Sequence, residues 1–235
     1  MGDRVLPVDV STVQERVYLE VQAALHQGRF MPGEAVTIRS LAQAVGTSPM
    51  PIRGAIQRLV AEKALVQLPN RTFRVAPFDL DIHAEQTRIR CAVEGFAAYR
   101  AAIRAPAGLV DELRDANGTM RGAVAAGDTD GVLDANRQFH FALYRGAESS
   151  QLTEMITQFW LRSGPFIAMA LRTPESRTMF EAGTRLHDRI IDAIGKQDPD
   201  GARFALALDI RAAAAWFRRR YRSEQSDPGE GSPAA

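Results

Sequence analysis

The chain has 235 residues, 46% of them hydrophobic, and a formal net charge of +1. This length can form one large domain or two small ones, and the net charge by itself points to no class of partner. Its single cysteine, Cys91, excludes an intrachain disulfide framework, and no apolar run approaches the roughly 18 residues of a membrane span, so we expect a cytoplasmic protein with no membrane partner.

The charges are distributed unevenly along the chain. Residues 1–76 carry 9 Lys and Arg against 6 Asp and Glu, whereas residues 77–235 carry 20 against 22. The excess is concentrated in residues 37–75, where six basic residues stand against one acidic residue, Glu62. Such a segment is expected where one module contacts a polyanion, and an ordinary solvated basic face is the alternative.

The first elements in chain order are three helices. Apolar residues at helical spacing predict a helix over residues 11–27, ended by Gly28, and "MPGEAV" after it is expected to be a loop. A short helix capped by Thr37 follows, with Leu41, Ala42 and Val45 facing inward, and Gly46-Thr47 forms a tight turn. The third helix begins at Ser48, because Pro49 and Pro51 are tolerated in a first turn whose N–H groups lack helical partners.

The third helix has two distinct faces. Its apolar stripe consists of Ile52, Ala55, Ile56, Leu59 and Val60, and its other face of Met50, Arg53, Gly54 and Gln57. Two short strands, 65–68 and 72–75, are predicted next, with a turn at Pro69-Asn70-Arg71. Helix, turn and helix followed by a two-stranded wing is the arrangement that places a helix in the DNA major groove. Residues 1–76 are therefore predicted to be a winged helix-turn-helix domain.

The remainder is predicted to be helical, so the fold class is mainly α. After a linker at 76–79 we expect helices over 79–104, 107–126, 128–147, 149–171, 174–196 and 198–222. Gly164-Pro165 should break or kink the fourth of these. Residues 77–222 would form a helical effector-binding and dimerisation domain, and the Gly- and Pro-rich residues 223–235 a disordered tail.

Several segments resemble one family when taken together. "PGEAVTIRSLAQAVGTSPMPIRGAIQRLVAEKALV" is similar to the DNA-binding signature of GntR-type bacterial regulators. The segments "RCAVE", "NRQFH", "RLHDRIIDAI" and "DPDGARFALALDI" resemble the FCD effector domain of the FadR-like branch, in its six-helix, VanR-like variant. Pro49, Gly54 and the Arg71-Thr72 pair depart from the residues usual in that signature.

The resemblance implies DNA contacts in the basic segment. These would come from Arg39, Ser48, Met50, Arg53 and Arg71. The residues themselves agree, since Arg53 lies opposite the apolar stripe near a helix N-terminus, where a guanidinium can reach guanine or phosphate. Ser48 and the free N–H groups beside it can bind a phosphate.

Two of the four histidines fall on inward faces of the second half. Asn136 and His140 are one helical turn apart, and His187 lies on a stripe with Ile190 and Ile191. Asp209 lies among apolar residues, where an unpaired carboxylate is costly and a cation would remove that cost. The resemblance implies a divalent metal held by Asn136, His140, His187 and Asp209, with Asp209 replacing the usual His. Zn²⁺, Ni²⁺ or Mn²⁺ suits these donors, and hydrogen-bonded core histidines with Asp209 paired to an arginine are the alternative.

Arg90 matches an arginine on the first helix of the family's effector domain. It could hold an effector carboxylate or form an ion pair with Glu94 one turn later. The resulting expectation is a homodimeric transcriptional repressor, and not an enzyme, that binds an inverted-repeat operator and responds to a small organic acid near the metal. A metal-responsive regulator and a metal-dependent hydrolase are the alternatives.

Overall fold

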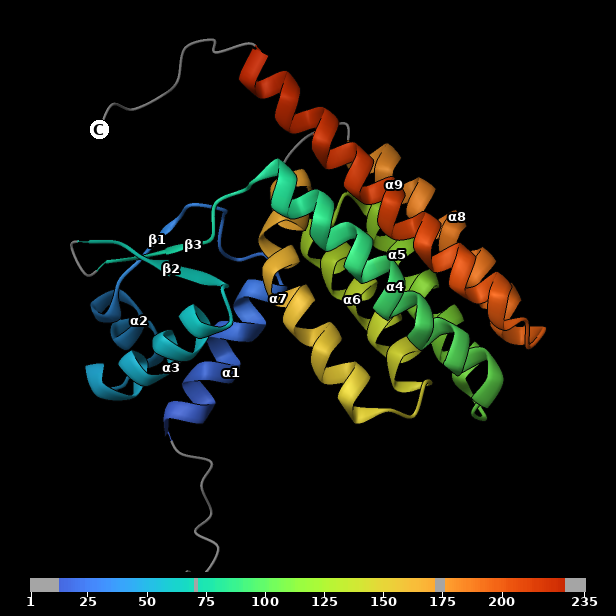
Figure 1. Cartoon of the computed structure of the whole chain (residues 1–235), viewed down its shortest axis with the longest axis horizontal. Helices are drawn as coiled ribbons and strands as arrows, with labels where there is room; N and C mark the ends of the chain where they lie inside the picture. Colours follow the sequence, from blue (N-terminus) through green and yellow to red (C-terminus); the bar gives the residue numbers. More distant parts are fainter. Residues whose placement is uncertain (1–12, 70–71, 172–175, 227–235) are drawn as a thin grey trace, which may run out of the picture.

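The computed structural model describes residues 13–69, 72–171 and 176–226, and it divides into a small α/β part and a helical part (Figure 1). Arg71 and the end of the expected tail, residues 227–235, lie outside the described residues. Among the described residues, no helix combines the length and the apolarity that crossing a bilayer requires. The predicted fold class, mainly α with a winged helix-turn-helix followed by a helical bundle, is confirmed.

The N-terminal part contains three helices and a small sheet. They are α1 (Val13–His26), β1 (Ala35–Val36), α2 (Ile38–Val45), α3 (Pro49–Ala61), β2 (Leu65–Gln67) and β3 (Phe73–Val75). The sheet is antiparallel in the order β1-β3-β2, with Val36 opposite Phe73 and Leu65 opposite Val75. The expectation that "MPGEAV" is only a loop was wrong, because its last two residues form β1. Two residues are too few to show the alternation that identifies a strand.

Local capping explains where α2 begins and ends. The Thr37 hydroxyl accepts a hydrogen bond from the Ser40 N–H, 3.0 Å away, and Gly46 ends α2 in the left-handed region at φ 69°. Ser48 occupies the N-cap position of α3, although its side chain makes no capping hydrogen bond. Val45 is exposed rather than inward-facing, because α2 is short and only Leu41 and Ala42 point at α3.

The helical part contains six helices, as predicted. They are α4 (Leu80–Arg104), α5 (Leu109–Ala126), α6 (Thr129–Arg145), α7 (Ser150–Leu171), α8 (Ser176–Gly195) and α9 (Pro199–Ser226). The Asp79 carboxylate caps α4 by accepting from the N–H groups of Asp81 and Ile82. α4 and α9 run side by side along one face of the bundle (Figure 1).

Two helix boundaries in the helical part differ from the prediction. Pro165 lies inside α7, so the helix is not broken there. α9 continues to Ser226, so residues 223–226 of the expected tail are helical. The long, mostly polar end of α9 shows no clear compositional limit at residue 222.

α7 connects the two parts of the chain. Its Leu161 is buried in the same cluster as Val17, Val21 and Leu25 of α1, which in turn packs against α3. Gly164 lies so close to α1 that a Cβ atom there would collide with the carbonyl oxygen of Leu25. The helix that bridges the two parts is thus in direct van der Waals contact with the helix supporting α3.

Candidate functional site

The exposed face of α3 carries the residues expected to contact DNA. Met50 is 82% exposed, and Arg53, Ser48 before α3 and Arg39 on α2 are exposed as well. Neither arginine has an ion-pair partner within the described part of the chain. Gly54 was expected on this face, but it packs against the side chain of Gln14 on α1 instead.

A cavity of about 530 Å³ lies in the helical part. Much of its wall is aromatic, contributed by Trp160, Phe166, Phe180, Trp216 and Phe217. Its polar wall includes Arg90, Asn136, His140 and Asp209, four of the five residues predicted to bind metal or effector. The fifth, His187, is fully buried next to them. The five residues, which are far apart in the sequence, therefore lie close together at this cavity, as expected.

Hydrogen bonds determine the tautomer of His140. The Tyr144 hydroxyl donates its only proton to Glu94 Oε2, at 2.5 Å, because a carboxylate can only accept. The same hydroxyl is 3.2 Å from Nδ1 of His140. It must accept there, so Nδ1 carries the proton and Nε2 of a neutral His140 presents a lone pair.

The same reasoning applies to His187. The Asn117 amide nitrogen donates to the Thr184 carbonyl at 3.0 Å and to Asp188 at 2.8 Å, which identifies the other amide atom as oxygen. This Oδ1 lies 3.2 Å from Nδ1 of His187 and accepts its proton. Nε2 of His187 is then a lone pair, and it is buried without a hydrogen-bond partner in the described structure.

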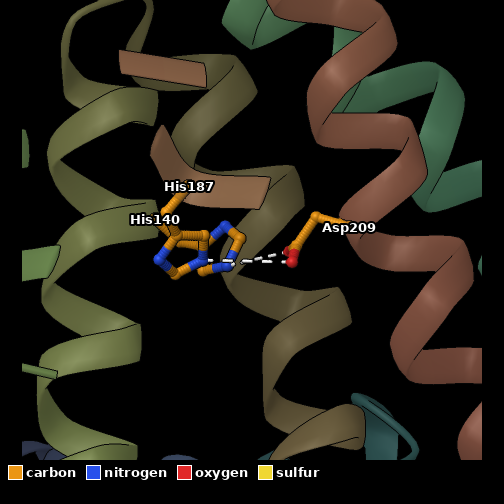
Figure 2. A group of neighbouring side chains, drawn as sticks. All are labelled: His140, His187 and Asp209. Carbon is orange, nitrogen blue, oxygen red and sulfur yellow. Dashed lines mark ion pairs between the residues drawn. The ribbon is translucent and has the colours of Figure 1, made fainter. Parts of the chain in front are cut away.

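Both lone pairs face the carboxylate of Asp209. His140 Nε2 is 3.4 Å from one oxygen and His187 Nε2 is 4.0 Å from the other. Figure 2 shows the two rings directed at the carboxylate, with α6, α8 and α9 each contributing one side chain. Three electron-pair donors that converge in a buried place repel one another unless a cation lies among them.

The pKa shifts of His187 and Asp209 indicate their charges. Burial lowers the pKa of His187 to about 3, although the nearby Asp209 partly opposes that effect. Burial alone would raise the pKa of Asp209, but without a metal between the two residues a hydrogen bond from His140, together with the charges of His187, His140 and Arg90, lowers it below its usual value. At neutral pH His187 is neutral and Asp209 ionised, which are the forms that bind a metal.

The spacing of these donors fits a transition-metal ion. Ligands about 2.0–2.2 Å from one ion lie roughly 3–4 Å from each other, and the donor atoms of His140, His187 and Asp209 all lie within 4.8 Å of one another. Asn136, one turn before His140, lines the same cavity and offers an amide oxygen as a fourth donor. Two imidazoles with carboxylate and amide oxygens suit Zn²⁺, Ni²⁺ or Mn²⁺.

The sequence left two roles open for Arg90, a position on the effector cavity and an ion pair with Glu94, and the structure is compatible with both. Arg90 lines the cavity, and it also forms a two-pronged ion pair with the fully buried Glu94, at 2.5 and 3.2 Å. Its remaining terminal nitrogen is 3.4 Å from the Ser163 hydroxyl. Much of its charge is thus used within the protein, which makes Arg90 a weaker anchor for a free carboxylate than we expected.

Three supporting residues were not recognised from the sequence: Asn117, Tyr144 and Trp160. Tyr144 follows His140 by four residues, a spacing that could have indicated it, as it did for Glu94 and Arg90. Asn117 lies on α5, and only the packing of α5 against α8 brings it to His187. The Trp160 indole is 3.4 Å from Glu94, and no motif signals it.

Sequence profiles identify both parts of the chain. The profile of bacterial regulatory proteins of the gntR family matches residues 13–75, and the FCD domain profile matches residues 85–212. The chain belongs to the GntR family. It is a transcriptional regulator with a DNA-binding GntR domain and an FCD domain, as the resemblance implied.

Individual relatives of this GntR-family regulator are also transcriptional regulators. The HTH-type transcriptional regulator McbR of Escherichia coli K12 is 29% identical over 205 residues, covering 86% of this chain and 91% of McbR. The "Probable D-xylose utilization operon transcriptional repressor" of Paenarthrobacter nicotinovorans is 28% identical, covering 86% and 87%. Both are transcriptional regulators rather than enzymes, which removes the hydrolase alternative.

Solved structures of the regulator's relatives share its fold. E. coli McbR/YncC superposes with a TM-score of 0.83 at 26% identity, over 90% of this chain and 100% of that chain. A GntR transcriptional regulator from Rhodococcus sp. RHA1 superposes with a TM-score of 0.74 at 21% identity, over 88% and 98%. The second likeness shows the common fold alone.

Proposed function

We propose that the regulator is a homodimeric repressor whose affinity for an inverted-repeat operator is controlled by a small organic acid bound beside a divalent metal. Residues 13–75 would bind the operator through Arg39, Ser48, Met50, Arg53 and Arg71. The metal would be held by Asn136, His140, His187 and Asp209. The observation that carries the proposal is the convergence of the Nε2 atoms of His140 and His187 on the Asp209 carboxylate at the cavity wall.

The charge of the loaded site favours an anionic effector. Asn136 and the two histidines are neutral ligands, so only Asp209 would offset the two charges of the metal. Arg90 is balanced by Glu94, which leaves a net charge of about +1 inside a cavity with an aromatic wall. A carboxylate bound at the metal would neutralise that charge, and its apolar remainder would pack against Trp160, Phe166 and Phe180.

α7 offers a direct route from the cavity to the DNA-binding helix. Trp160, Ser163 and Phe166 line the cavity, while Leu161 and Gly164 of the same helix face α1. A ligand that shifts α7 therefore moves the support of α3, and differences in α7 position can become differences in operator affinity.

Metal analysis of the purified protein tests the proposal. After soaking with Zn²⁺, Ni²⁺ or Mn²⁺ and removal of excess metal, mass spectrometry should find close to one ion per chain for at least one metal. His187→Ala should lose that ion, and His26→Gln, which changes a half-buried histidine outside the site, should keep it. If no metal binds to the wild type, a proton on His140 would be the cation that pairs with Asp209, and the metal part of the proposal would be wrong.

A regulator that senses the metal itself is the second candidate, because the same residues support it. The two candidates differ in an operator titration by fluorescence anisotropy. If free metal alone changes operator affinity to its full extent, metal is the signal. If metal-loaded protein still needs an added carboxylate, the organic acid is the signal.

A further inference from the structure

The cavity of the helical part extends well beyond the candidate metal site. Asp209 and Arg219 both line it from α9, and their positions in the helix are about 15 Å apart along its axis. Ala212, Ala213 and Trp216 line it between them, at the spacing that keeps residues on one helix face. A small monocarboxylate bound at the metal would therefore leave the far part of the cavity unfilled.

The far part of the cavity has a wall of its own. We call His83, Phe217 and Arg219 the distal end of the cavity, which they all line. His83 lies seven residues before Arg90 on α4, about 10 Å along that helix. Arg218 is close enough to His83 to influence its pKa, whereas His140 and His187 influence that of Asp209. The distal end and the metal end are thus opposite ends of one elongated space.

The His83 ring at the distal end is held in place by aromatic side chains but has no hydrogen bond. Its centroid lies 5.0 Å from that of Phe78, 6.3 Å from that of Phe166 and 6.0 Å from that of Phe217. Nδ1 is buried without a partner in the described structure, so Nε2 is the nitrogen that a ligand can reach. Burial lowers the pKa of His83 to about 4, and the charges of nearby arginines lower it further. A neutral imidazole at neutral pH can donate one N–H to a ligand oxygen.

The distal end is also positively charged. Arg219 is exposed where it lines the cavity, and it has no ion-pair partner within the described residues. Among the described residues of the wall, Asp209 at the metal end is the only acidic one. A guanidinium without a partner at the rim of an apolar cavity suits a carboxylate, which it can bind through two parallel hydrogen bonds.

We propose that the distal end binds a second carboxylate of the effector, so that the effector is an elongated dicarboxylic acid. One carboxylate would lie at the metal and the other between Arg219 and His83. The apolar or aromatic middle of the molecule would pack against Trp216 and Phe166. This inference rests on the proposed function, in which an organic acid binds beside the metal, and it specifies the class of acid.

Calorimetric titration with matched pairs of acids tests the second carboxylate. The full chain is saturated with Zn²⁺, Ni²⁺ or Mn²⁺ in turn and titrated with octanoate and suberate, and with p-toluate and terephthalate. Each pair differs only by a methyl group or a carboxylate at the far end. In at least one pair the dicarboxylate should bind about tenfold or more tightly, because only it reaches Arg219.

Variants of Arg219 assign that preference to the distal end. Arg219→Met should bind the dicarboxylate only as tightly as the wild type binds its monocarboxylate partner, and its affinity for the monocarboxylate should be unchanged. Arg219→Lys keeps the charge and should retain part of the preference. Arg114→Met, which changes an exposed arginine of α5 outside the cavity wall, is the control and should behave as wild type.

The outcomes separate this inference from the proposed function. If mono- and dicarboxylates bind equally well, or if Arg219→Met keeps the preference, the distal end holds no carboxylate while the proposed function stands. If none of the four acids binds to the metal-loaded wild type, an organic acid effector at the metal and the inference built on it are both wrong.

Discussion

At the scale of single residues, the candidate metal site depends on side chains that never touch the metal. Tyr144 and Asn117 accept the Nδ1 protons of His140 and His187 and thereby turn both Nε2 lone pairs toward Asp209. Such partners make a ligand more basic and hold its ring in place. Mutation of a proposed ligand should therefore abolish metal binding, whereas mutation of a supporting residue should only weaken it.

Tyr144→Phe should weaken metal binding by about 10–100-fold, because it removes the acceptor of the His140 proton and leaves Nδ1 unpaired. The affinity can be measured by competition with a chromogenic chelator. Tyr99→Phe, on α4 and outside the cavity wall, is the control and should bind metal as wild type does. Equal affinities of Tyr144→Phe and wild type would show that the hydroxyl does not position His140.

His26 should make stability depend on pH. It lies at the junction of α1 and the helical part, beside Phe141, and burial lowers its pKa to about 4. The unfolded chain has a histidine pKa near 6.5 and takes up a proton first as pH falls, so stability should decrease from about pH 6.5 to about pH 4 and level off below it. Urea titrations should show His26→Gln losing less stability over this range, by about 1–2 kcal/mol. An identical pH profile in both proteins would contradict the assignment.

At the scale of elements, α3 exposes the side proposed to face DNA because Ile52, Ile56 and Leu59 on its other side are buried in packing. Arg53→Ala should cost about 1–3 kcal/mol of operator binding while leaving non-specific DNA binding almost unchanged. Lys63→Ala, which removes a nearby exposed charge outside α3, should mainly reduce the salt dependence instead. Fluorescence titrations with operator and scrambled DNA measure both. If Arg53→Ala weakens both DNAs equally, the arginine contacts only phosphate.

Contact between α7 and α1 should transmit the effector signal. Gly164→Ala forces the two helices apart, because its Cβ would collide with backbone atoms of Leu25 and His26, and should destabilise the protein by about 1–3 kcal/mol. Gly118→Ala on α5 meets no atom within 4 Å and should stabilise it by about 0.5–1 kcal/mol. Denaturant unfolding gives both values. A neutral Gly164→Ala would mean that α7 and α1 are not tightly packed in solution.

At the scale of the whole molecule, a bound metal would join α6, α8 and α9 and stabilise the folded chain as a unit. At a free metal concentration 100 times the dissociation constant, the gain is about 2.7 kcal/mol, which corresponds to a melting-temperature rise of roughly 5–10 °C for a chain of this size. Calorimetry with metal and with chelator measures this shift. His187→Ala should melt at the same temperature in both, and a shift that persists in this variant would place the metal elsewhere.

The sequence by itself determined most element positions, because local rules act there. Thr37 and Asp79 cap helices because each directly precedes a helical segment. Asn136 and His140 share a face through helical spacing alone. The meeting of α6, α8 and α9 at one candidate metal site was accessible only through the family resemblance, since spacing relates residues within a helix and not between helices. Asn117 illustrates this limit, because only the packing of α5 on α8 brings its amide to His187.

Tertiary structure alone decided which apolar faces are buried. Periodicity showed that Val45 and Leu41 could share a face, but α2 is too short to bury both. On α4 the residues Ala97 and Ala101 lie in the core while the larger Phe96 and Ile103 are exposed, which hydrophobicity would have reversed. The reason is physical: a helix has several faces, and the neighbours packed against it, rather than its own composition, determine which of them loses contact with water.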